Sequence, residues 1–193
     1  MEQAVVQSDT VILIDAAFLN LVVEDVKKNF ERMLNRSLQN VDIRDLIVYL
    51  ALDAGVRNGD NKVQVLFVYD KDSMLLKHCI PSDLAVKLND VAFNDSLGEF
   101  AFNSYQPEQL ISREELYLEF LRVLLDAKEV KRMIVVSFNE EYGDKVMKIL
   151  KDTKDKELIQ FRMNEPECQV SFRWEILAYP VMQALGIKGD ELK

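Results

Sequence analysis

The sequence of 193 residues has few of the residue types that build common catalytic and structural centres. Its two cysteines, Cys79 and Cys168, are too few for a disulfide framework or a thiolate zinc site. Its one histidine, His78, lies in a segment without metal-ligand spacing, which argues against a zinc enzyme or a histidine-based triad. We therefore expect His78 to be a structural or surface residue.

Glycine and proline are also scarce, with six and four residues respectively. The glycines form neither a G-x-G-x-x-G pattern nor a P-loop, which excludes nucleotide binding through those devices. The sequence has no G-x-S-x-G motif either, so the nucleophile turn of the α/β-hydrolases is excluded. The small number of glycines and prolines indicates tight connections between the helices and strands.

Positive charge is in deficit, because 24 Lys and Arg stand against 33 Asp and Glu, for a net charge of −9. Nucleic-acid affinity depends on cations that neutralise phosphates, so this balance counts against a general nucleic-acid binder. A basic stripe recurs every three residues, at Lys145, Lys148, Lys151 and Lys154. Asp152 and Asp155 are interspersed there, which favours a solvated helix face.

Long apolar runs are missing too. The chain has no run of about 18 uncharged apolar residues, so we expect no membrane partner. The first charged residue is Glu2 instead of a basic one, and Asp15 interrupts the first apolar stretch, so we expect no signal peptide. These features together predict a cytoplasmic location.

What the sequence does contain is a series of short apolar runs typical of buried strands. Residues 11–14 are continuously apolar and mostly β-branched, and the run ends abruptly at Asp15. A run of the same design at 133–137 predicts a neighbouring parallel strand over 131–137. Further strands are predicted at 63–69, at 99–105 near an edge, and at 157–163.

Apolar residues at intervals of three and four predict helices between these strands. The predicted helices cover residues 18–36, 42–55, 82–92, 112–127, 140–152 and 180–185. Ser112 and Glu115 form the signature of a capping box at the start of one of them. Two assignments stay open: the middle of 42–55 is apolar all round and fits a strand as well, and 169–176 fits a strand or the beginning of a helix.

Strands that alternate with helices predict an α/β fold, a three-layer sandwich with a mainly parallel sheet and helices on both faces. We expect a single domain over 1–193, with a core over about 10–165 and a C-terminal extension at 166–193. In such sheets ligands bind beyond the carboxyl ends of the strands. The polar residues predicted at that end are Asp15, Asp70, Asn139, Glu140 and Glu141.

These carboxylates are the candidate chemistry. Mg²⁺ and Mn²⁺ prefer oxygen ligands, and two such ions about 4 Å apart can assist phosphodiester hydrolysis. Capping is the alternative role for Glu140 and Glu141, which lie in the first turn of a predicted helix, and for Glu115 in its capping box. Asp15 differs from them, because an unpaired carboxylate at the end of a buried strand would be costly.

Over about residues 10–165 the chain resembles the NYN and wider PIN-like nuclease superfamily. In that family the first strand ends in aspartate, glycine, any residue, asparagine and leucine, where this chain has Asp15-Ala16-Ala17-Phe18-Leu19. The fourth strand ends in serine, glycine, aspartate, any residue, aspartate and phenylalanine, where this chain has Ser137-Phe138-Asn139-Glu140-Glu141-Tyr142. Glu115 stands near the place of a further family aspartate. The resemblance implies a five-stranded sheet of order 3-2-1-4-5.

The resemblance also implies a Mg²⁺- or Mn²⁺-dependent endoribonuclease that acts on RNA. Asp15 and Glu141 would be the catalytic residues, and the metal ligands would be Asp15, Glu115, Asn139 and Glu141. The chain departs from the family pattern at polar positions, because Phe18 replaces an asparagine, Asn139 an aspartate and Glu141 another aspartate.

A non-catalytic module on the same fold, which binds a protein partner or a second copy of itself, is the alternative. The two hypotheses differ in geometry. Carboxylates of Asp15 and Glu141 within about 6 Å across an open cleft would suit a shared hydrated ion. A cleft filled by Phe18, or a Glu141 side chain turned to solvent, would contradict the metal site.

Overall fold

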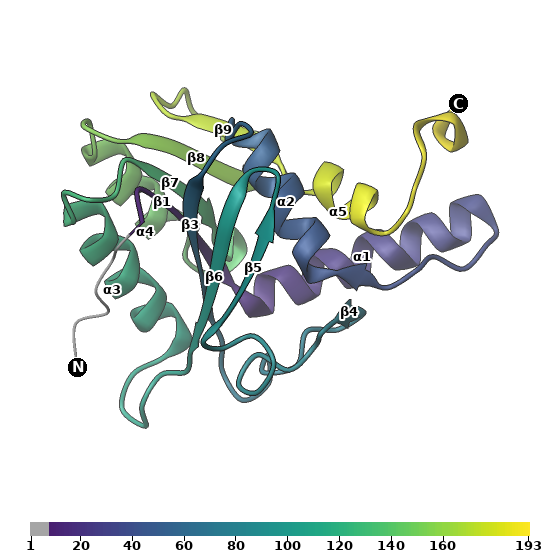
Figure 1. Cartoon of the computed structure of the whole chain (residues 1–193), viewed down its shortest axis with the longest axis horizontal. Coiled ribbons are helices and arrows are strands. Elements are labelled where there is room, and N and C mark those ends of the chain that lie inside the picture. Colours follow the sequence, from purple (N-terminus) through teal and green to yellow (C-terminus); the bar gives the residue numbers. More distant parts are fainter. Residues whose placement is uncertain (1–7) are drawn as a thin grey trace.

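The computed structural model describes residues 8–193, and its centre is a seven-stranded, mostly parallel sheet (Figure 1). The strand order is β5-β6-β3-β1-β7-β8-β9. The strands are β1 (Thr10–Asp15), β3 (Asn61–Val68), β5 (Val91–Asp95), β6 (Gly98–Tyr105), β7 (Arg132–Val136), β8 (Glu157–Arg162) and β9 (Arg173–Ile176). β5 is antiparallel to β6, and the other neighbouring pairs are parallel. A small separate sheet pairs β2 (Val41–Asp42) with β4 (Cys79–Ile80).

The predicted α/β architecture with a mainly parallel sheet is confirmed, but the sheet has seven strands instead of the five predicted. The five expected strands do lie in the order β6-β3-β1-β7-β8, with β1 at the centre. The structure adds β5 at one edge and β9 at the other. Both additions are edge strands with exposed or half-buried residues, so they lack the continuous apolar runs that mark the central strands.

The helix predicted at 82–92 is also wrong. The side chain of Asp83 accepts a hydrogen bond from the backbone of Val86 at 2.9 Å, and this supports one turn only. The chain then turns at Asp90, whose φ is +54°, and enters β5. Leu84 and Leu88 are buried as the apolar spacing suggested, but they belong to an irregular segment.

The two open assignments are resolved by the structure. The stretch around 42–55 is helix α2 (Ile43–Asp53), which Asp42 caps by accepting from the backbone of Arg44 at 2.8 Å. In the stretch 169–176 the last four residues form strand β9, which pairs with β8. The chain continues into α5 (Ala178–Ala184) and a final 3-10 turn (Gly189–Leu192).

Helices cover both faces of the sheet (Figure 1). α1 (Ala16–Leu34), α2 and α5 lie on one side, where Ile12 and Ile14 of β1 join their core. α3 (Arg113–Asp126) and α4 (Asn139–Asp152) lie on the other, where Val11 and Leu13 join a second core. Alternate residues of β1 therefore enter opposite cores, which explains its uninterrupted apolar run.

Two expectations from composition concern the chain as a whole. Within residues 8–193, none of the helices has the length and apolar character needed to cross a bilayer. The first seven residues, on which the expectation of no signal peptide partly depends, lie outside the described range. Cys79 and Cys168 are free thiols, and burial raises the pKa of Cys79 to about 12.

Candidate functional site

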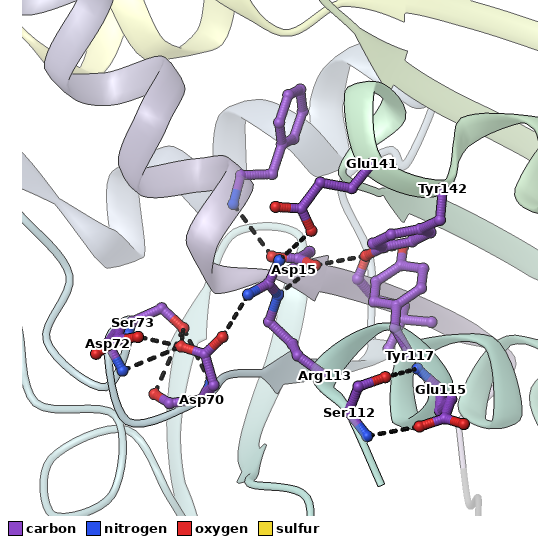
Figure 2. Close-up of polar contacts among 12 residues, drawn as sticks. Asp15, Asp70, Asp72, Ser73, Ser112, Arg113, Glu115, Tyr117, Glu141 and Tyr142 are labelled. Carbon is purple, nitrogen blue, oxygen red and sulfur yellow. Dashed lines mark hydrogen bonds and ion pairs between the residues drawn. The ribbon is translucent and has the colours of Figure 1, made fainter.

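The carboxyl ends of three strands meet around one guanidinium, that of Arg113 at the start of α3 (Figure 2). Its Nε donates to Asp15 Oδ2 at 3.0 Å, its Nη2 to Glu141 Oε2 at 2.5 Å, and its Nη1 to Asp70 Oδ2. Asp15 ends β1, Asp70 follows β3, and Glu141 follows β7 in the first turn of α4. We call these four residues the Arg113 cluster.

Asp15 is completely buried, and both of its carboxylate oxygens accept hydrogen bonds. Oδ1 accepts from the backbone N–H of Phe18 at 3.1 Å, which caps the start of α1. Oδ2 accepts from Arg113 and from the Tyr142 hydroxyl at 2.5 Å. A buried carboxylate is tolerated when it is paired and hydrogen-bonded in this way, so the cost expected from the sequence is offset locally.

Two buried tyrosines complete the surroundings of β1. Burial raises the pKa of the Tyr142 phenol well above its ordinary value, and the Asp15 charge raises it further, so the hydroxyl stays a donor. Tyr142 reaches Asp15 from a kink in α4, where its φ of −143° is not helical. Tyr117 of α3 packs against it with ring centroids 5.5 Å apart and donates to the carbonyl of Leu13 at 3.2 Å.

The electrostatics of the cluster favour the charged forms of Arg113 and Asp70. Burial alone would lower the pKa of Arg113, but Asp15, Asp70 and Glu141 together raise it above its ordinary value. Burial would likewise raise the pKa of Asp70, but hydrogen bonds from Ser73 and Arg113 lower it below the ordinary value. Asp70 Oδ1 also accepts from the Ser73 hydroxyl at 2.8 Å, which holds the turn after β3 in place.

Two phenylalanine side chains, Phe138 and Phe18, form a packed pair beside the guanidinium. The Phe138 ring centroid is 5.7 Å from the Arg113 guanidinium carbon, and the same ring packs on Phe18 at 5.4 Å. Phe18 is only 1% exposed. Phe18, which stands where the resemblance implies a polar asparagine, is therefore part of the core that supports the cluster.

The other predicted metal ligands make different contacts. Glu115 accepts from the backbone of Ser112 at 2.7 Å, and the Ser112 hydroxyl accepts from the backbone of Glu115, so the capping box is confirmed. Asn139 Oδ1 accepts from the Ser137 hydroxyl at 3.1 Å and from Gln160 Nε2 at 3.3 Å. The structure thus brings Asp15 and Glu141 to one arginine, and it leaves Glu115 and Asn139 in separate interactions.

This arrangement does not fit Mg²⁺ or Mn²⁺. Within residues 8–193, no group of three or more His, Cys, Asp or Glu side chains is placed to hold a metal ion. Arg113 lies between the carboxylates, so a divalent cation among them would face a guanidinium with the same sign of charge. Asp15 Oδ2 already accepts hydrogen bonds from Arg113 and Tyr142, and Glu141 Oε2 accepts one from Arg113.

Sequence reasoning did not single out Arg113 or Tyr142. A signal for Arg113 does exist, because a cation in the first turn of a helix opposes the helix dipole and calls for carboxylate partners. Arg113 directly follows the cap residue Ser112, so it holds that unfavourable position. For Tyr142 the sequence offers no comparable signal, since its role depends on a kink inside α4.

Residues 4–192 match the model of a protein family described as a family of unknown function, DUF6621. The chain belongs to this family. Comparisons with curated proteins and with solved structures give no match. The family description states no activity, so the likeness to PIN-like nucleases stays a prediction.

Proposed function

We propose that this protein is a non-catalytic protein-interaction module, and that its acidic centre stabilises the fold instead of hydrolysing RNA. The position of Arg113 carries the proposal. Its guanidinium bonds to Asp15, Asp70 and Glu141 at the sheet edge, where a metal-dependent nuclease would need its cation. A side chain that is only 12% exposed and held by three partners is a fixed part of the fold.

The loops beyond the same edge support a binding role. The backbone N–H of Tyr69 donates to the carbonyl of Tyr105 at 3.0 Å, so the loops after β3 and β6 leave the sheet side by side. They carry large apolar side chains in solvent: Leu75, Ile111 and Leu110, of which the last is 97% exposed. Exposed apolar side chains on loops favour contact with another protein.

Charge favours a basic partner over a second copy of the chain. The net charge is −9, and Glu140 and Glu141 are exposed at this edge. Two copies would bring like charges together, whereas a surface rich in Lys and Arg would attract them. We therefore propose a partner with apolar residues inside a basic rim.

The catalytic part of the proposal is tested by titrating Mn²⁺ into the intact protein by calorimetry. We expect no saturable binding, and no metal-dependent cleavage of single-stranded RNA. Glu141→Gln is the matched variant, because Glu141 is half exposed and its replacement leaves the core intact. Stoichiometric Mn²⁺ binding by the wild type that is lost in Glu141→Gln would overturn the proposal and support the metal-dependent hypothesis.

The interaction part is tested with Leu110→Asp and with the control Val123→Asp. Val123 is also exposed, but it lies in the last turns of α3, away from the loops beyond β3 and β6. The tagged intact chain should capture a basic protein from cell extract, and the purified pair should rebind. Leu110→Asp should abolish rebinding, and Val123→Asp should leave it unchanged. Equal effects of the two variants would refute this docking edge, and a concentration-dependent dimer lost in Leu110→Asp would identify a second copy as the occupant.

A further inference from the structure

A second candidate site lies at the amino ends of β8 and β9, the opposite end of the sheet from the Arg113 cluster. A surface groove of about 470 Å³ is bounded by the turn after α4 and by the segment that enters β9. It arises from the register of the edge strands, because β9 pairs with β8 only from Ile159 and Arg173 onward. The first two residues of β8 therefore have no partner in β9. Phe172, which directly precedes the first residue of β9, lines the groove.

Cations dominate the lining of this groove. The lysines and arginine that line it are Lys151, Lys154, Lys156 and Arg173. Among the described residues of the lining, Glu157 is the one carboxylate, and it is paired with Arg132 at 2.8 Å. In a chain with a net charge of −9, such a local excess of positive charge runs against the overall composition.

Two of these cations are held in place by the fold. Lys156 Nζ donates to the carbonyls of Ala127 at 2.6 Å and Val130 at 2.7 Å, which fix the ammonium without neutralising its charge. Arg173 donates to the carbonyl of Asp53 and also pairs with Glu175 at 2.7 Å, so its charge is shared. Lys151 and Lys154 are exposed on the last turn of α4 and the turn that follows it, and Lys151 Nζ donates one hydrogen bond to Cys168 Sγ at 3.1 Å.

We propose that this groove binds a small phosphate-bearing molecule, with the phosphate near Lys151, Lys154 and Lys156 and an apolar part against Phe172. The volume lies in the range of small-molecule sites. Lysine ammonium groups bind phosphate as point charges, and the hydroxyl of Ser171 in the lining can donate to its oxygens. The Thr153 hydroxyl donates to the carbonyl of Ile149 at 3.0 Å instead. The groove is separate from the Arg113 cluster, so this inference and the proposed function can fail independently.

The alternative is that these lysines bind no ligand, and that they form a solvated face or interact favourably with the negative end of the α4 dipole. The lysine stripe supplies the control that separates the two readings. Lys148 belongs to the same stripe on α4 but does not line the groove, whereas Lys151 and Lys154 do. Loss of Lys148 removes the same charge from the same lysine stripe and leaves the groove intact.

The test titrates pyrophosphate, and separately glycerol 2-phosphate, into the intact protein by calorimetry at fixed ionic strength. We expect saturable binding of one molecule per chain. Lys154→Gln should weaken it by about tenfold, the scale of one charge-assisted hydrogen bond, and Lys148→Gln by less than about twofold. Trp174 is the one tryptophan of the chain and lies two residues beyond Phe172, so its fluorescence should change on binding in the wild type.

Three outcomes would overturn the inference. The first is an absence of saturable binding of either phosphate compound at millimolar concentration. The second is equal weakening by Lys154→Gln and Lys148→Gln, which would assign the effect to general attraction by the helix face. The third is binding of a single-stranded RNA oligomer in the absence of binding of the small phosphates, which would make the surface a backbone contact for RNA.

Discussion

Removal of the Arg113 guanidinium is the most direct test of the role assigned to the cluster. Arg113→Met keeps an unbranched side chain of similar length and removes the charge and the donors. The three carboxylates are affected unequally, because Asp15 is fully buried while the Asp70 and Glu141 side chains are 28% and 48% exposed. Breaking a buried pair by removing one partner costs about 3–5 kcal/mol, and an exposed pair contributes at most about 1 kcal/mol.

We therefore expect Arg113→Met to lower the free energy of unfolding by about 3–5 kcal/mol, with the Asp15 pair as the main source. Urea denaturation at neutral pH, followed by circular dichroism, measures this loss. Arg44→Met is the control, since Arg44 is 63% exposed in a loose pair at 3.9 Å. Its guanidinium carbon also lies 5.7 Å from the Phe93 ring centroid, so its loss should change stability by at most about 1 kcal/mol.

A double-mutant cycle with Asp15→Asn isolates the pair itself. Asparagine still offers Oδ1 to the backbone of Phe18 and removes the buried charge. The double variant should be more stable than the sum of the single effects predicts, by on the order of 2 kcal/mol. Additive single effects, or a loss below about 1 kcal/mol in Arg113→Met, would show that the cluster does not hold the sheet edge together.

Two further predictions concern acid stability and backbone geometry. The pKa of Asp70 is lower in the folded state than in the unfolded chain, so its contribution to stability is present above the unfolded pKa and is lost as the pH falls through the folded pKa. Asp70→Asn should therefore make the free energy of unfolding less dependent on pH below about pH 4. An unchanged pH dependence in denaturation experiments between about pH 2 and 6 would contradict this. Gly98 has φ +135°, and a Cβ there would lie 2.0 Å from the backbone oxygen of Asn61, so Gly98→Ala should lower the free energy of unfolding by about 3 kcal/mol or more. Gly189→Ala has no atom within 4 Å of the added Cβ and should leave thermal denaturation nearly unchanged; equal shifts for the two variants would refute the argument.

The central part of the fold could be predicted because its information is local. The runs at 11–14, 65–68 and 133–136 are apolar and buried on both faces, and a strand buried between two helix layers requires that pattern. The helix starts at Asp42 and Ser112 carry their own capping side chains. Such features can be read without knowing what lies across the sheet.

The edges could not be predicted, because their conformation depends on partners. β5 has exposed or half-buried residues throughout, and its conformation follows from pairing with β6 after the turn at Gly98. The apolar residues Leu84 and Leu88 before it have helical spacing, yet a single capped turn places both in the core. In a segment this short, apolar residues spaced three and four apart therefore do not distinguish a helix from a single turn.

The candidate site could be predicted only in part. Asp15 was identifiable because a carboxylate at the end of a buried run needs a partner, and the strands that follow it indicated which sheet edge it shares. Its partner was not identifiable, since Arg113 lies 98 residues away along the chain. A cation in the first turn of a helix opposes the helix dipole and needs a carboxylate partner, and this points to Arg113. It does not identify which carboxylates are the partners.

The Arg113 cluster has a further consequence for how strands β1, β3 and β7 align. Strands that are apolar on both faces carry little pattern to fix their register, because a shifted strand still presents apolar side chains to both cores. A shift of one residue moves a strand by about 3.3 Å, which takes a carboxylate at its end out of hydrogen-bond reach of a fixed guanidinium. The hydrogen bonds of Arg113 therefore favour one register of the three strands, and a sheet with a shifted register would leave Asp15 buried without its cation.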